Sequence, residues 1–268
     1  MQVLEVPAGT GWRWMLEGFR LMRRRPLALL GMTVLFLFTI VLPTVIPVVG
    51  GFAPLVLTPA LAVGFMRAVR IAEAGAMPAP WTLFSALGEG GQKGLRALLL
   101  LGMINCVLTV AVLAVSMFAD GGTLFRIATG AIGNDDPALS QGSVVYAALV
   151  FLVLYTPVQM AMWYAPVFVA WHGLHPVKAL FYSLFAVWRN RGAFVVYLIA
   201  WFAVAVGLSV LVQVTKAVVP PGVLPMLLSP LSLVMLCALY CSFWPTYRDV
   251  VAELSPPPPV SPPTTPAT

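Results

Sequence analysis

Charged residues are scarce in this sequence. Only 9% of its 268 residues are Asp, Glu, Lys or Arg, whereas 60% are hydrophobic and the mean hydropathy is +0.96. Soluble domains carry about 25% charged residues. A water-soluble globule is therefore excluded, and the lipid bilayer is the expected solvent for this chain.

Cysteine is also rare, and its placement excludes a disulfide framework. Cys106, Cys237 and Cys241 all lie inside apolar runs. In such runs a cysteine behaves as a small buried hydrophobic residue.

The groups that carry out catalysis or bind metals are nearly missing. His172 and His175 are the two histidines, but a metal site needs three or four ligands and no cysteine or carboxylate lies near them in sequence. The signatures of nucleotide-binding loops, serine hydrolases and zinc proteases are absent. We therefore expect no catalytic residue, no cofactor and no metal, and a protein that is not an enzyme. If the protein were an enzyme, its one candidate catalytic group would be formed by these histidines with Arg248 and Asp249.

Long uncharged stretches make up much of the sequence. Five of them lack Asp, Glu, Lys, Arg and His, namely 27–66, 97–119, 137–171, 192–215 and 217–247. A transmembrane helix needs about 20 apolar residues, so the first stretch is long enough for two crossings, with a turn at "LPTVIPVVGG". The pattern predicts an all-α integral membrane protein with six transmembrane helices, at about 27–46, 50–70, 96–118, 143–170, 193–216 and 222–244. The fourth is long for one crossing and is expected to be tilted or bent at Pro157 or Pro166.

The basic residues predict the orientation. With six crossings, 13 of the 15 Lys and Arg residues fall on the side that holds both termini, and only Arg126 and Lys216 fall on the other. Basic residues mark the cytoplasmic side. Both termini of the chain are therefore expected in the cytoplasm. Because the charges lie at the ends of apolar segments, we expect no nucleic-acid partner despite the pI of about 9.6.

The chain is expected to form one membrane domain, residues 1–254, followed by a proline-rich tail. The tail, "SPPPPVSPPTTPAT" at 255–268, has seven prolines and no charge. It cannot form a helix or a core, so it is expected to be extended and disordered in the cytoplasm.

Amphipathic segments precede the first, third and fifth crossings. In "WRWMLEGFRLMRR" the hydrophobic residues Trp12, Met15, Leu16, Phe19 and Met22 share one helical face, opposite Arg13, Glu17, Arg20 and Arg24. This pattern is typical of a helix in the membrane interface. Similar segments occur at 80–96 and 176–190, and the first is weakened by its glycines. The even-numbered crossings also share prolines. One description of the chain is therefore three repeated units, each an interfacial helix followed by a hairpin. The alternative is that there is no repeat and the prolines are unrelated, since proline is common in membrane helices.

Strong polar groups within the crossings are few. Asn105 and Gln159 lie well inside them. Hydrogen bonding between helices explains such residues more simply than contact with a solute does. Both remain candidate intramembrane polar contacts.

Three segments resemble a known protein family. "AGTGWRWMLEGFRLMRRRPLALLG", "MAMWYAPVFVAWHGLHPVKALFYSLFAVWRN" and "YCSFWPTYRD" resemble a bacterial inner-membrane family of unknown function and, more distantly, the membrane domain that precedes some glycerophosphodiester phosphodiesterases. The resemblance implies a six-helix membrane protein and no known activity, since the soluble phosphodiesterase domain is absent. The matching positions are Gly9, Gly11, Trp12, Trp14, Gly18, Pro26, Trp163, Ala165, Pro166, Ala179, Ser183, Asn190, Tyr247, Arg248 and Asp249.

Two functions follow from these patterns as expectations. The first is a non-enzymatic envelope component that binds membrane lipids or an unidentified protein partner, with Arg20, Arg23, Arg24 and Arg25 as candidate contacts for lipid headgroups. Plain anchoring by basic residues explains the same arginines. The alternative is a carrier for a neutral or lipidic solute, through a cavity lined by the proline-bent even-numbered helices.

Overall fold

The computed structural model confirms an all-α membrane protein with six helices long and apolar enough to cross a bilayer. It describes residues 2–46, 50–88, 90–128, 131, 142–216 and 223–252; the proline-rich tail lies outside them. The candidate spans are Pro26–Val45, Ala53–Glu73, Gly91–Asp120, Gly142–His172, Arg191–Lys216 and Leu228–Val250.

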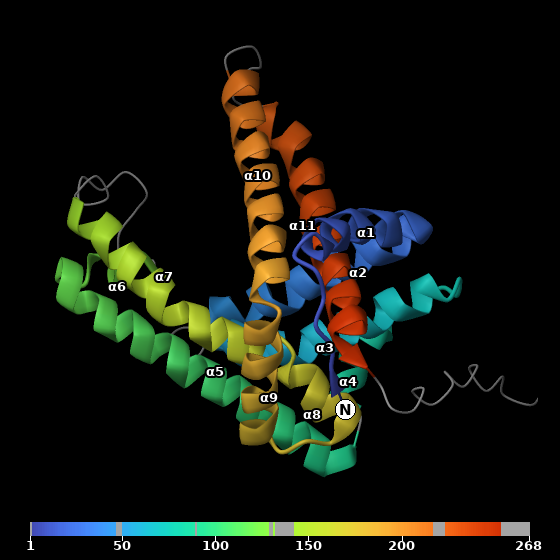
Figure 1. Cartoon of the computed structure of the whole chain (residues 1–268). Helices are drawn as coiled ribbons and strands as arrows, with labels where there is room; N and C mark the ends of the chain where they lie inside the picture. Colours follow the sequence, from blue (N-terminus) through green and yellow to red (C-terminus); the bar gives the residue numbers. More distant parts are fainter. Residues whose placement is uncertain are drawn as a thin grey trace, which may run out of the picture.

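The spans form three hairpins. The first pairs α2 (Pro26–Val41), which ends in the 3-10 turn η1 (Leu42–Val45), with α3 (Ala53–Glu73). The second pairs α5 (Gly91–Asp120) with α7 (Gly142–Met162), and the short α6 (Thr123–Ala128) lies at its tip. The third pairs α10 (Arg191–Lys216) with α11 (Leu224–Val250). In Figure 1 the α5/α7 and α10/α11 hairpins point in different directions from a common region near α8 and α9.

The fourth span is broken rather than bent. Helix α7 runs straight through Pro157, and the helix stops at Trp163–Tyr164, after which α8 (Ala165–His172) begins. Ser183 of α9 (Pro176–Arg189) holds the break together, because its hydroxyl accepts from the Tyr164 N–H and donates to the Met160 carbonyl, both at 2.9 Å. Unpaired backbone groups are costly in a membrane, so one side chain stabilises both ends of the break.

The amphipathic segments link the hairpins in a ring. Helix α1 (Thr10–Arg24) packs on α11, the pair η2 (Pro80–Phe84) and α4 (Ser85–Gly88) packs on α3, and α9 packs on α7 and α8. Each segment thus contacts the second crossing of the preceding hairpin, and α1 closes the circle by contacting the last one. The segment before α5 is short because Gly90 and Gly91 adopt positive φ angles of 71° and 59°.

The buried face of α1 matches the predicted one only in part. Met15 and Met22 of the predicted face are buried, but Trp12 is 50% exposed, and Trp14 and Leu21, which lie outside that face, are fully buried. The reason is close backbone approach at two glycines. A Cβ on Gly11 would collide with the backbone of Ala193 and Tyr197 in α10, and one on Gly18 would collide with α11. Hydrophobicity does not mark glycines as contact positions, so the observed face is shifted toward Trp14 and Leu21.

The two ends of the described chain are tied together. Two-residue strands, β1 (Gln2–Val3) and β2 (Val251–Ala252), pair in antiparallel fashion. Asn190 fixes the same segment, because its side chain accepts from the Val6 N–H and donates to the Leu4 carbonyl, both at 2.9 Å. The first residues of the chain therefore belong to the folded domain.

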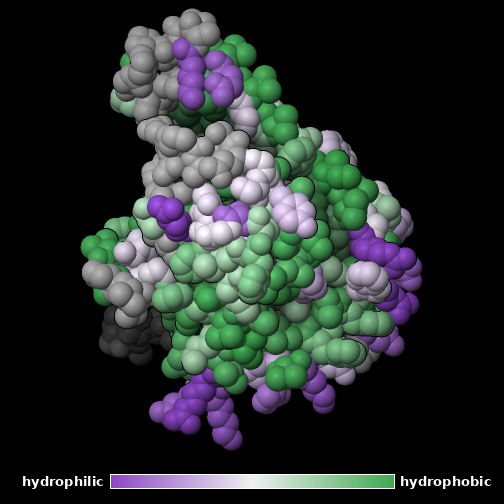
Figure 2. Space-filling model, turned by 90° about the vertical axis from the view of Figure 1, so that its left-hand side faces the viewer, coloured by the Kyte–Doolittle hydropathy of each residue, from purple (hydrophilic) through white to green (hydrophobic). Residues whose placement is uncertain are grey.

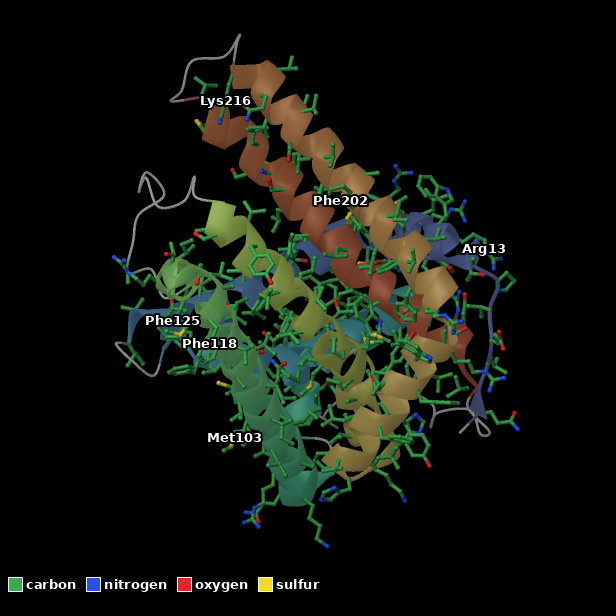
Figure 3. All side chains as sticks on the ribbon, turned by 60° about the vertical axis from the view of Figure 1, so that its left-hand side comes forward. Arg13, Met103, Phe118, Phe125, Phe202 and Lys216 are labelled. Carbon is green, nitrogen blue, oxygen red and sulfur yellow. The ribbon has the colours of Figure 1, made fainter. Side chains whose placement is uncertain are left out.

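The outer surface of the hairpins is apolar. Met103 of α5, Phe118 of α5 and Phe202 of α10 point away from the body of the protein (Figure 3), and Phe118 is 92% exposed. In Figure 2 hydrophobic residues form a broad area, and the most hydrophilic ones lie mostly toward its margins. Such a surface suits lipid tails.

Candidate functional site

A cavity of about 260 Å³ lies where the second crossings of the three hairpins meet. It is partly open, and its walls come from α3, α5, the α7–α8 break and α11. The lining residues are Thr58, Pro59, Ala62, Val63, Met66, Asn105, Gln159, Met162, Trp163, Tyr164, Pro166, Val167, Leu239, Tyr240 and Phe243. None of them carries a charge, and the exposed area of the walls is mainly apolar.

Asn105 and Gln159, the two polar residues singled out in the crossings, line this same cavity. Asn105 is 8% exposed, and its amide Nδ2 donates to the Leu55 carbonyl at 3.0 Å. That carbonyl lacks its helical partner, because residue 59 is a proline without an N–H. Asn105 therefore repairs the backbone of α3 across the interface between α3 and α5.

The same bond fixes the orientation of the Asn105 amide. With Nδ2 facing a carbonyl, Oδ1 points elsewhere, and it is buried with no hydrogen-bond partner among the described residues. Gly102, one turn earlier, allows this approach, since a Cβ there would meet the backbone of Val56. The result is one buried acceptor without a partner among the described residues, enclosed beside the cavity rather than open to it.

An aromatic layer separates the cavity from the end of the bundle that holds both described termini, called here the basic end. Tyr164 lines the cavity, is 1% exposed, and its hydroxyl donates to the Thr246 carbonyl at 2.9 Å. Its ring is 5.9 Å from that of Tyr247, which in turn stacks on Trp244. The guanidinium of Arg70 lies about 6 Å from the ring centres of both Trp171 and Trp244, a favourable cation–π distance.

Beyond this layer lies a charge cluster formed by Glu17, Glu73, Arg248 and Asp249. Arg248 pairs with Glu73 at 2.7 Å, Glu17 at 3.0 Å and Asp249 at 3.2 Å. Two tryptophans extend the cluster. The indole of Trp244 donates to Glu73 at 2.5 Å, and the indole of Trp14 donates to Asp249 at 2.9 Å.

The charge cluster joins three separate parts of the chain. Glu17 comes from α1, Glu73 from the end of α3, and Arg248 from the end of α11. The guanidinium fork suits several carboxylates at once. The cluster thus holds α1, α3 and α11 together at the basic end.

The four arginines predicted to contact lipid headgroups form two pairs, one bonded to the end of α3 and one exposed on α1. Arg24 donates to the Glu73 carbonyl at 2.6 Å, and Arg25 donates to the Gly75 carbonyl. These two side chains cap the end of α3. Arg20 and Arg23 are exposed on α1.

The histidines lie apart from any metal-binding group. The ring of His172 is 2.7 Å from the Tyr247 hydroxyl, whereas His175 is exposed at the start of α9. Among the described residues, no three His, Cys, Asp or Glu side chains come close enough to hold a metal ion. Arg248 and Asp249 are engaged with each other and with Glu17, Glu73 and Trp14.

Several residues that carry the family resemblance are junctions of this scaffold. Gly11 and Gly18 admit neighbouring backbones, Ser183 bridges the helix break, and Asn190 holds the N-terminal strand. Sequence reasoning did not find the contributions of Glu17 and Glu73. Their partners are 231 and 175 residues away, and no local pattern marks such a pairing.

A second hollow, of about 510 Å³, lies between α7 and α9. Its walls are almost entirely apolar, and Phe181 and Trp188, which line it, are each at least 60% exposed. Arg191 lies over the Trp188 ring at 5.8 Å. An open apolar groove of this kind is ordinary lipid-facing surface.

Comparison with known proteins places the chain among inner-membrane proteins. No protein-family model matches, and no solved structure matches. A probable inner membrane protein of Burkholderia thailandensis is 42% identical over 251 residues, covering 92% of this chain and 93% of that protein. The resemblance to the membrane domain of glycerophosphodiester phosphodiesterases receives no support from these comparisons and stays a prediction. With such identity across nearly the full length of both sequences, this chain belongs to the same family of multi-pass inner-membrane proteins as the Burkholderia protein.

Proposed function

We propose that this protein is a non-enzymatic inner-membrane component that binds one lipidic molecule in the cavity between the second crossings. The observation that carries the proposal is the cavity itself, with its uncharged, mainly apolar walls and two polar residues, Asn105 and Gln159, in its lining. Small-molecule sites have this composition, an apolar lining with a few placed polar groups. Its ligand would come from the bilayer, which is the solvent of the hairpins.

The size of the cavity restricts the ligand. Typical ligand pockets measure about 300 to 1,000 Å³, whereas this one holds about 260 Å³. A whole two-chain phospholipid does not fit. The proposed occupant is a small apolar molecule, or one end of a slender amphiphile whose remainder lies between the hairpins.

Filling the cavity should remove the ligand. Ala62 lines it on α3, so Ala62→Phe places a ring in the space the ligand would use. The matched control is Ala203→Phe, at an exposed position on α10. Native mass spectrometry of protein extracted without detergent is expected to show one small molecule at fixed stoichiometry on the wild type and on Ala203→Phe. Its occupancy should be at least about tenfold lower on Ala62→Phe.

Two results would overturn the proposal. One is wild-type protein that carries only bulk lipid in bulk proportions. The other is equal retention of the small molecule by Ala62→Phe. A protein subunit retained at fixed stoichiometry, with no small molecule, would instead support binding to a protein partner.

A carrier for a neutral solute is the second candidate. The cavity lies beside Pro59 of α3 and Pro166 of α8, where backbone regularity is already broken. Transport would require the aromatic layer and the charge cluster to separate, opening the basic end. A cross-link between Glu17→Cys and Arg248→Cys would block transport and leave binding intact.

The proposed orientation places the basic end in the cytoplasm. Basic residues gather on this side, whereas Lys216 lies at the far tip of the third hairpin (Figure 3), and such a bias sets topology. There the exposed Arg20 and Arg23 would meet anionic headgroups, at about 1 kcal/mol each. A reporter enzyme active only in the periplasm should be inactive when fused after residue 254. It should be active when fused after residue 216, and the reverse pattern would contradict this orientation.

A further inference from the structure

We propose that the hollow between α7 and α9, called here the α7/α9 groove, binds one phospholipid with an anionic headgroup. One acyl chain lies in the groove, and the guanidinium of Arg191 binds the phosphate. The groove measures about 510 Å³ and is lined by residues of α7 between Val153 and Met160 and by residues of α9 between Phe181 and Trp188. It shares no lining residue with the cavity between the second crossings, so this inference concerns a second site and goes beyond the proposed function.

The walls of the groove suit an acyl chain. Its volume lies within the range of about 300 to 1,000 Å³ that is typical of ligand sites. The lining contains one hydroxyl, that of Thr156, which already donates to the Leu152 carbonyl of its own helix at 2.7 Å. Phe181 and Trp188 expose most of their rings. A hydrocarbon chain can therefore enter from the bilayer without leaving a polar group of the wall unpaired.

One end of the groove lies at the basic end of the protein. Trp188 lines the groove, and Asn190, two residues later, holds the N-terminal segment through Leu4 and Val6. Exposed tryptophans favour the level of the lipid headgroups. A lipid whose chain follows the groove would therefore place its phosphate near Trp188.

Arg191 is the feature that distinguishes the groove from other lipid-facing surface. Its side chain is exposed, and its guanidinium lies 5.8 Å from the centre of the Trp188 ring. Among the described residues it pairs with no carboxylate, whereas the neighbouring Arg189 pairs with Glu5 at 3.5 Å. A guanidinium matches the geometry of phosphate oxygens and can bind two of them at once. An apolar groove alone takes any lipid, but this one has a phosphate-binding group at its rim.

The surrounding charges favour a headgroup with a net negative charge. Lys178, Arg189 and Arg191 outnumber Glu5, the carboxylate that the described structure places beside them. The ammonium group of a zwitterionic lipid would be repelled by these cations. We therefore expect a preference of about fivefold for the anionic lipid, the factor that one basic residue contributes near an anionic surface.

The test uses two photoactivatable lipids with the same diazirine-bearing acyl chain. One is a phosphatidylglycerol and the other a phosphatidylcholine, each added at the same low mole fraction to the full-length protein in nanodiscs. Peptide mass spectrometry counts labels at 153–160 and 181–188, divided by labels at 198–214 on the exposed face of α10, which reports contact with bulk lipid. On the wild type this normalised labelling should be about fivefold higher with phosphatidylglycerol.

Two charge variants separate Arg191 from the general positive charge of the basic end. Arg191→Gln should bring the ratio of phosphatidylglycerol to phosphatidylcholine labelling to about one. Arg189→Gln removes an equal charge two residues away, from a side chain engaged with Glu5, and should keep the wild-type ratio. Equal labelling of the wild-type groove by both lipids would overturn the proposal, and so would equal losses in the two variants.

A second pair of variants tests the groove itself. Val153→Trp fills it from α7, and should lower labelling at 181–188 by both lipids at least about fivefold. Val145→Trp is the matched control, because Val145 is also an exposed residue of α7 but does not line the groove. Both positions face lipid, so neither change disturbs the core. Unchanged labelling at 181–188 in Val153→Trp would show that no acyl chain lies in the groove.

Discussion

Replacing Trp14 by alanine is expected to lower the free energy of unfolding by about 3 to 5 kcal/mol, the range found for buried aromatic residues. Trp14 is fully buried where α1 meets α10 and α11, with ring centres 5.4 Å from Phe194 and 6.1 Å from Tyr197. Its indole also donates to Asp249 at 2.9 Å. The variant therefore loses ring contacts and leaves one carboxylate oxygen of the charge cluster without this donor.

The same helix supplies a matched control. Trp12 is 50% exposed, so Trp12→Ala should change stability by less than about 1 kcal/mol. Trp14→Phe keeps a ring and removes the N–H, and should fall between the two. Thermal unfolding of the three variants in one detergent measures the order. Equal losses for Trp12→Ala and Trp14→Ala would contradict the observed orientation of α1.

Arg248→Ala is expected to cost about 2 to 3 kcal/mol, because hydrogen bonds to charged groups contribute more than neutral ones and three carboxylates lose their shared cation. The residue is partly exposed, which keeps the loss below that of a fully buried pair. The ends of α1, α3 and α11 should separate first. Limited proteolysis near residues 73–80 is expected to become faster in this variant.

Two further substitutions define what the guanidinium contributes. Arg248→Lys keeps the charge but cannot reach three carboxylates with a planar fork, so it should restore only part of the stability. Arg20→Ala, at an exposed position on α1, should leave stability unchanged. Full stability in Arg248→Ala would show that the charge cluster does not hold the basic end.

Much of the architecture is readable from the sequence, because the bilayer imposes simple requirements. Uncharged runs of 20 or more residues give the six crossings, and basic residues at their ends indicate which ends lie together. The weak helix before α5 follows from its glycines. The break at Trp163–Tyr164 lies directly before Pro166, one of the two prolines at which the sequence predicts a bend. Its stabilisation by Ser183 could not be predicted, because no local pattern connects that residue to the break.

The candidate site, too, could be predicted from the sequence only in part. Asn105 and Gln159 stand out in the sequence because polar groups inside crossings are rare, and the structure brings them to one cavity. That Asn105 repairs the carbonyl freed by Pro59 cannot be read from sequence, since it depends on the register between α3 and α5 set at Gly102. Similarly, hydropathy identified only part of the buried face of α1, since Met15 and Met22 are buried but Gly11 and Gly18 contribute contact without hydrophobicity.

The most direct test of the central claim is an experimental density map of the protein extracted with its own membrane, enlarged by a bound antibody fragment for electron microscopy. The account predicts continuous elongated density in the cavity between α3, α5, α8 and α11. Side chains from Met66, Gln159 and Tyr240 packed into that space, with no density between them, would contradict it.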